Sequence, residues 1–208
     1  MPIRVPEREY RDFASIAAAA EDQMIVTGYA TVFDTPYVLY EDEELRILEL
    51  VHHDAFRDAD LSDVIMQYNH EGRVFARNRN NTLTVRPDGK GLYMEAALGG
   101  TDLGRGLYQE IRGGYTDKMS YGYAIGVVEW EEIREGSLLI STRTVRSIKK
   151  VYDVSAVSIP ANSATSISVR SLADGVIAEV QAERLKATEL ALRRKRLELQ
   201  TKILRGVK

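Results

Sequence analysis

The chain contains no cysteine among its 208 residues, which excludes disulfide bonds and thiol nucleophiles. No apolar run approaches the ~18 residues that would indicate a membrane-spanning helix. The first residues lack the apolar segment of a secretory signal. A phosphate-binding loop is also missing, because Gly99-Gly100-Thr101 lacks the lysine that such a loop needs. These absences favour a cytoplasmic protein that is neither a thiol enzyme nor a nucleotide-binding one.

Histidine is scarce as well, with three residues in the chain. A serine nucleophile needs a base that accepts its proton and a third group that holds the base in the right tautomer. We predict that Ser120 is the nucleophile, His70 the general base and Asp153 the orienting acid. Residue types alone do not separate this triad from a structural His70 with satisfied hydrogen bonds, so both interpretations stay open here.

A second interpretation places a metal ion among His52, His53, Asp54, His70 and Glu71, whose donor atoms suit zinc or another first-row ion. Adjacent histidines at the end of a strand are expected to point apart. No HExxH spacing supports the site either. We therefore predict neither a metal nor another cofactor.

Strands are predicted wherever apolar and polar residues alternate. One such strand begins near Ser120, and its neighbours on the same face are the small residues Gly122, Ala124 and Gly126. The opposite face carries larger apolar and aromatic side chains. A face of small residues beside a hydroxyl leaves room for another backbone or for a substrate. The other strands are expected over residues 24–33, 45–51, 64–70, 82–86, 92–98, 137–146, 149–159 and 165–169.

Helices are predicted in fewer places. Thr101 is a good N-cap for a helix that ends at Gly113-Gly114. Residues 55–60 favour a short helix, and the alanine-rich residues 17–20 favour either a short helix or a loose segment. Residues 173–205 are rich in strong helix formers and predict one long helix.

Charge is unevenly distributed along the chain. The net charge is −3, whereas residues 184–208 hold nine Lys/Arg and two Glu, a balance of +7 that leaves −10 for the remainder. This asymmetry indicates either a tail that contacts an acidic partner or a solvated helix. We divide the chain into an N-terminal lead-in (1–23), a central domain (24–170) and a basic helical tail (171–208).

The order of the motifs is more specific than any one of them. The chain runs through GYATVFD, LELVHHDAF, QYNHE, a hairpin, MSYGY and YDVSAVSIPANSATSISVR. This succession closely resembles the prohead serine proteases of tailed bacteriophages, whose fold is similar to that of herpesvirus assemblin. The resemblance covers roughly residues 24–170. It implies a mainly β fold with flanking helices (α+β), a closed antiparallel β-barrel to which the sequence adds the long C-terminal helix.

The resemblance also implies roles for individual residues. It supports Ser120 and His70 as nucleophile and base on adjacent strands. The family usually has Glu where this chain has Asp153, a carboxylate one methylene shorter. The turn after the last long strand corresponds to the place where related enzymes stabilise the oxyanion, which makes Asn162 a candidate there.

The activity implied by the resemblance is serine endopeptidase cleavage during capsid maturation. The expected substrates are the scaffold segment of the major capsid protein and the protease itself, with removal of the tail, inside the assembling prohead in the host cytoplasm. A homodimer is a further option, and neither a membrane nor nucleic acid is an expected partner. The alternative is a catalytically inactive barrel that acts as a scaffold or assembly factor.

Overall fold

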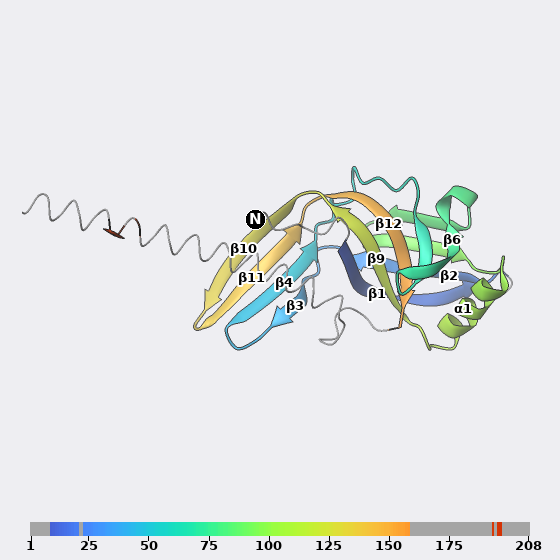
Figure 1. Ribbon diagram of the computed structural model, residues 1–208, viewed down its shortest axis with the longest axis horizontal. Coiled ribbons are helices and arrows are strands. Elements are labelled where there is room, and N and C mark those ends of the chain that lie inside the picture. The colour runs from blue at the N-terminus through green and yellow to red at the C-terminus, as the bar shows by residue number, and fades with distance from the viewer. Residues whose placement is uncertain (1–8, 21–22, 159–192, 194, 197–208) are drawn as a thin grey trace, which may run out of the picture. The chain divides into compact units, whose positions relative to one another are not determined.

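The computed structural model describes residues 9–20, 23–158, 193 and 195–196 (Figure 1). The chain divides into two compact units, one of residues 6–169 and one of residues 1–5 with 170–208. Every strand and helix named below belongs to the first unit. No helix within the described residues is long and apolar enough to cross a membrane.

Twelve strands, one α-helix and one 3₁₀ helix make up the described part of this unit. They are β1 (Glu9–Ala20), β2 (Ile25–Val32), β3 (Tyr37–Glu41), β4 (Leu45–Val51), β5 (Ile65–Tyr68), β6 (Glu71–Arg77), η1 (Asn78–Asn80), β7 (Leu83–Pro87), β8 (Gly91–Ala97), α1 (Asp102–Arg112), β9 (Lys118–Ile125), β10 (Val128–Glu135), β11 (Leu138–Val145) and β12 (Ile148–Val157).

The strands form two sheets. The larger has eight strands in the order β6-β5-β12-β9-β1-β2-β8-β7, and the smaller has four in the order β10-β11-β4-β3. Most neighbouring pairs are antiparallel, whereas β12 with β5 and β11 with β4 are parallel. In both parallel pairs, a strand from the early part of the chain, β4 or β5, pairs with a strand from its late part, β11 or β12.

The predicted closed barrel is wrong for the described residues. The eight-stranded sheet is open, because no ladder of hydrogen bonds pairs its two edge strands, β6 and β7. These strands follow each other in the chain and are connected through η1. A second sheet, which the prediction did not contain, takes up four strands. Strand periodicity reports which residues form strands, but sheet closure depends on register and strand tilt, which the pattern does not encode.

The described residues also contain fewer helices than the sequence predicts. Residues 55–60 form hydrogen-bonded turns, such as Ala55 N to His52 O (2.9 Å) and Arg57 N to Asp54 O (3.0 Å), rather than a helix. The described part of the chain contains no long C-terminal helix. Of the predicted range 173–205, the structure describes only residues 193, 195 and 196, and the predicted strand 165–169 lies outside the described residues.

The alanine-rich segment near the N-terminus is strand β1, not a short helix or a loose segment. Residues 9–15 of this strand pair with β9 and residues 16–20 pair with β2, so β1 joins these two strands in the middle of the large sheet. Alanine favours a helix by itself. The ladder of hydrogen bonds that β2 offers to the alanine-rich residues overrides this weak local preference.

One long hairpin links the two sheets (Figure 1). Strand β9 is followed directly by β10, and β11 is followed directly by β12, so both arms pass from one sheet to the other. The arms cross closely, with Gly126 N donating to Ser147 O (2.8 Å). A Cβ at Gly126 would lie 2.3 Å from Ser147 Oγ. At this position the small residue accommodates another backbone, one of the two possibilities that the sequence left open.

Helix α1 forms where the sequence predicts it, with the Thr101 side chain accepting from Gly104 N (3.0 Å) as N-cap. Its buried side chains Leu107, Tyr108 and Ile111 join the main hydrophobic core. The same core takes Met119, Tyr121 and Tyr123 from β9, all fully buried. One face of β9 is thereby fixed in the core, and Ser120 lies on the other.

Candidate active site

Strands β9 and β12 place three polar side chains on one face of the large sheet. In their antiparallel ladder Ser120 is directly opposite Ser155, and Gly122 is opposite Asp153. Residues opposite each other in a ladder project from the same face. Ser120, Ser155 and Asp153 therefore share the face that lies opposite the core tyrosines of β9, and all three are fully buried.

A β-bulge decides that Asp153 is on this face. The register shifts between Val151, which pairs with Tyr123, and Asp153, which pairs with Gly122. Strict alternation would put Val151 and Asp153 on the same face. The extra residue at Tyr152 separates them, so Val151 packs in the core and Asp153 faces Ser120. Alternation along the sequence alone therefore does not give the face on which Asp153 lies.

His70 lies in a tight turn rather than at the end of a strand. Strands β5 and β6 pair up to Tyr68 opposite Glu71, which leaves Asn69 and His70 as the two residues of the turn. Both have left-handed backbone angles, with φ of 51° and 61°. Two-residue turns of this kind require positive φ at both positions. Because β5 pairs with β12, the turn lies beside the strand that carries Asp153.

The three predicted residues are in hydrogen-bond contact. His70 Nδ1 lies 2.6 Å from Asp153 Oδ1, and His70 Nε2 lies 2.5 Å from Ser120 Oγ. A carboxylate only accepts hydrogen bonds, so His70 Nδ1 carries a proton and donates it. In a neutral imidazole Nε2 is then the acceptor, and the Ser120 hydroxyl donates to it. This is the arrangement needed to remove a proton from Ser120.

Burial strengthens these contacts. Asp153 has no exposed side-chain surface, while the His70 side chain is 16% exposed. The same Asp153 oxygen also accepts from Ser155 Oγ (2.7 Å). Donors held around a buried carboxylate stabilise its charged form and fix its orientation. Ser155 therefore holds Asp153 ready for His70, a role that the sequence analysis did not assign, although the alternation from Asp153 places Ser155 on the same face.

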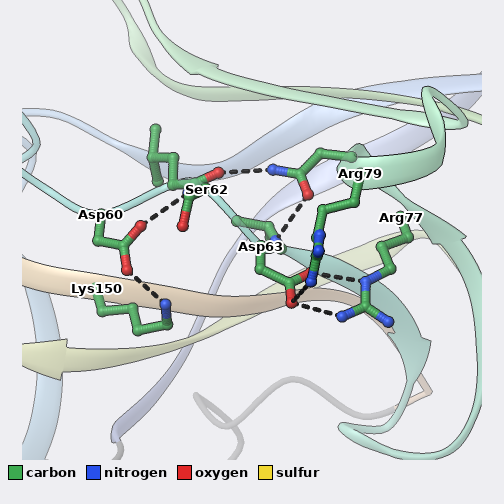
Figure 2. Close-up of polar contacts among 9 residues, drawn as sticks. Asp60, Ser62, Asp63, Arg77, Arg79 and Lys150 are labelled. Carbon is green, nitrogen blue, oxygen red and sulfur yellow. Dashed lines mark hydrogen bonds and ion pairs between the residues drawn. The ribbon is translucent and has the colours of Figure 1, made fainter.

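A polar cluster links the segment before β5 to β6, η1 and β12 (Figure 2). Asp63 accepts from the guanidinium of Arg77 on β6, with Nε to Oδ1 at 2.6 Å, and from Arg79 Nη1 at 3.5 Å. The Asn78 amide bridges the same segment by accepting from Val64 N (3.0 Å). These contacts join the entry of β5 to the exit of β6. The turn that carries His70 thus projects from a hairpin fixed at its base.

Two carboxylates of this cluster titrate below their usual range. The hydrogen bond from Arg77 lowers the pKa of Asp63. The hydrogen bond from the Lys150 ammonium on β12, together with donors from Ser62, lowers the pKa of Asp60. Both carboxylates are therefore charged at neutral pH, and the Asp60–Lys150 pair attaches the segment before β5 directly to β12 (Figure 2).

The alternative metal site is not assembled as the sequence suggested. His70 contacts Ser120 and Asp153 instead of the other two histidines. His52 and His53 lie next to each other with ring centroids 4.0 Å apart, contrary to the expectation that they point apart. Their ligand atoms lie within 4.8 Å of a carboxylate oxygen of Asp34, which the sequence analysis did not include. His53 Nδ1 is 2.8 Å from Asp34 Oδ2. Asp34, His52 and His53 together offer three ligand atoms that could hold a metal ion.

The oxyanion candidate Asn162 lies outside the described residues. The described residues provide a serine, a histidine and a carboxylate that are joined in this order by hydrogen bonds. A second serine donates a hydrogen bond to the same carboxylate. Such an arrangement can activate the serine for attack on a carbonyl carbon.

Comparison with known proteins identifies one family. The family model described as caudovirus prohead serine protease matches residues 12–177, which is most of the chain and includes most of β1. No curated protein and no solved structure matched the chain. The likeness to the assemblin fold therefore stays a prediction.

Proposed function

The chain belongs to the caudovirus prohead serine protease family, and from this membership we propose that it is an endopeptidase with Ser120 as nucleophile, His70 as general base and Asp153 as orienting acid. The observation that carries the proposal is the continuous hydrogen-bonded relay from Ser120 Oγ through the imidazole to the Asp153 carboxylate. A structural histidine would also satisfy its two nitrogens. It would not need a serine on one side and a buried carboxylate on the other.

The proposed reaction proceeds by acyl transfer. Ser120 Oγ attacks the carbonyl carbon of the scissile peptide while His70 Nε2 takes the hydroxyl proton. Asp153 keeps the Nδ1 proton in place and stabilises the imidazolium. His70 then gives the proton to the leaving amine, the C–N bond breaks, and an ester to Ser120 remains. Water, deprotonated by His70, hydrolyses this ester and regenerates the free serine.

Substrate access requires a local opening. Ser120 has no exposed surface, whereas part of His70 is exposed. A peptide carbonyl must come within bonding distance of Oγ, so we propose that binding or assembly uncovers this face of β9. Next to Ser120 on that face, Gly122 has no side chain that would obstruct an extended peptide.

The proposed substrates follow from the family. Prohead proteases act in the phage prohead within the host cell. We propose that this chain cleaves the scaffold segment of the major capsid protein and also itself, with loss of the basic tail after residue 170. The +7 balance of residues 184–208 supports a tail that docks on an acidic partner in the shell.

Intact-mass spectrometry tests the proposal directly. The wild-type chain and Ser120→Ala are each co-expressed with the cognate capsid protein, and the masses of both proteins are measured before and after particle assembly. We expect shortened capsid protein and shortened protease only with the wild type. Unchanged masses of both proteins in assembled wild-type particles would refute the endopeptidase.

A second function is favoured by one observation, the complete burial of Ser120. A chain whose nucleophile is never uncovered would serve as an assembly factor. It predicts that Ser120→Ala particles form and mature like the wild type. Particle yield in the same experiment therefore separates the two functions.

A further inference from the structure

His70 has an unusual backbone for a residue on which a reaction depends. It is the second residue of the β5–β6 turn, and its φ of 61° lies in the left-handed region. Glycine is the residue usually found there, because a side chain makes this conformation strained. A strained residue keeps its place only if its surroundings hold it. The contacts of the turn therefore bear on how well His70 is positioned.

Asn69, the first residue of the turn, supplies these contacts. Its backbone N donates to Ala156 O (2.9 Å). Its side-chain Oδ1 accepts from Ser158 N (3.0 Å) and from Ser158 Oγ (3.3 Å). The β5–β12 ladder ends at Tyr68 opposite Ala156. The Asn69 side chain thus continues the pairing beyond the point where the β5 backbone turns away.

We propose that Asn69 is a positioning residue that holds the His70 turn against β12 and so sets the His70–Asp153 and His70–Ser120 distances. Strand β12 supplies the carboxylate that orients His70, and Ser158, the residue directly after this strand, anchors the turn. The contact of His70 with Asp153 and the contact of Asn69 with Ser158 therefore hold the turn at two points that are five residues apart in the chain. This inference rests on the proposed role of His70 as general base.

A purely conformational role for Asn69 is the competing explanation, since asparagine tolerates left-handed backbone well. Glycine separates the two roles. Asn69→Gly keeps the backbone freedom of the turn and removes the hydrogen bonds to Ser158. Asn69→Asp keeps both the acceptor oxygen and the tolerance of positive φ. The chain also offers a matched control at Asn81 at the end of η1, which is exposed like Asn69 and also has a left-handed φ, 61° against 51°.

The test measures how fast a fluorophosphonate probe labels Ser120 at pH 8 in the full-length chain, both free and in assembled particles. The probe reacts with an activated serine and needs no knowledge of the peptide specificity. We expect Asn69→Gly to slow labelling by about tenfold, the equivalent of one or two net hydrogen bonds. Asn69→Asp and Asn81→Gly should stay within about threefold of the wild type.

Proton NMR provides a second readout that fold stability alone does not move. The downfield resonance of the proton between His70 Nδ1 and Asp153 should broaden or shift in Asn69→Gly and persist in Asn81→Gly. Equal labelling rates in the wild type and Asn69→Gly, with the resonance unchanged, would overturn the inference. A wild-type chain labelled no faster than Ser120→Ala, both free and in assembled particles, would instead contradict the proposed general-base function itself.

Discussion

The described residues contain two polar triples that are each built on a buried carboxylate and differ in chemistry. In the large sheet, Ser120, His70 and Asp153 form the relay described above. In the small sheet, Glu49 accepts from the Tyr37 hydroxyl and from the Arg143 guanidinium, and Glu49 and Arg143 are both buried. Each triple has a fully buried carboxylate that receives two or more donors.

The difference lies in the group next to the carboxylate. Histidine can exist without a proton near neutral pH, so His70 can accept one from Ser120. Arginine stays protonated throughout the accessible pH range, so the Glu49–Arg143 pair has no proton to exchange. We infer that the first triple serves chemistry and the second holds β3, β4 and β11 together. Each prediction below tests this contrast, from the largest expected effect to the smallest.

The largest effect is expected for Asp153→Asn. The amide would donate to His70 Nδ1 and force the proton onto Nε2, where it blocks transfer from Ser120. We expect a ~10³- to 10⁴-fold loss of activity, as seen generally when a triad carboxylate becomes an amide. Thermal unfolding should change little. The measurement is the rate of probe labelling alongside calorimetry, and a wild-type rate would show that the carboxylate has no part in catalysis.

Arg143→Met should affect stability rather than activity. It leaves the buried Glu49 carboxylate without its guanidinium, and breaking a buried pair from one side costs about 3–5 kcal/mol of unfolding free energy. Urea unfolding measures the loss. Arg46→Met is the control, because its partner Glu41 is exposed and the change should cost less than about 1 kcal/mol. If the folded fraction of Arg143→Met lost its labelling by the probe, the division between the two triples would be wrong.

A smaller loss of activity is expected for Ser155→Ala. It removes one hydrogen bond to Asp153 and leaves the His70 contact in place. A hydrogen bond to a charged group contributes about 1.5–3 kcal/mol, so labelling should slow by roughly 10- to 100-fold. Ser141→Ala is the matched control, since this buried serine is in the small sheet and its Oγ has no hydrogen-bond partner. A Ser155→Ala rate equal to that of Ser141→Ala would refute the support that we assign to Ser155.

The smallest effect is expected for Asp63, a partly buried carboxylate in the segment before β5. Arg77 lowers the pKa of Asp63 in the folded chain, so this contact stabilises the fold above about pH 4, the ordinary pKa of aspartate, and the contribution is lost as pH falls through the folded pKa. Asp63→Asn should lower Tm slightly at pH 7, and the difference from the wild type should shrink below pH ~4. Asp54→Asn is the control, and an equal pH dependence in both variants would contradict the role of Asp63.

Some features follow from the sequence because their causes are local. The turn residues Pro87-Asp88-Gly89 predict the β7–β8 hairpin, and Thr101 predicts the start of α1, since hydrogen bonds within a few residues decide both. The order of the motifs indicates the family, which the comparison confirms. Together with the scarcity of histidine, it also selects Ser120, His70 and Asp153, whose catalytic roles stay predictions.

The tertiary structure decides everything that depends on register between distant strands. It leaves the large sheet open, makes β1 a central strand and forms a second sheet around Glu49 and Arg143. The bulge at Tyr152 turns Asp153 toward Ser120, and Ser158 meets Asn69 across 89 residues of chain. A one-residue shift in pairing reverses which side chains share a face. Such a shift depends on the partner strand, so local sequence patterns do not reveal it.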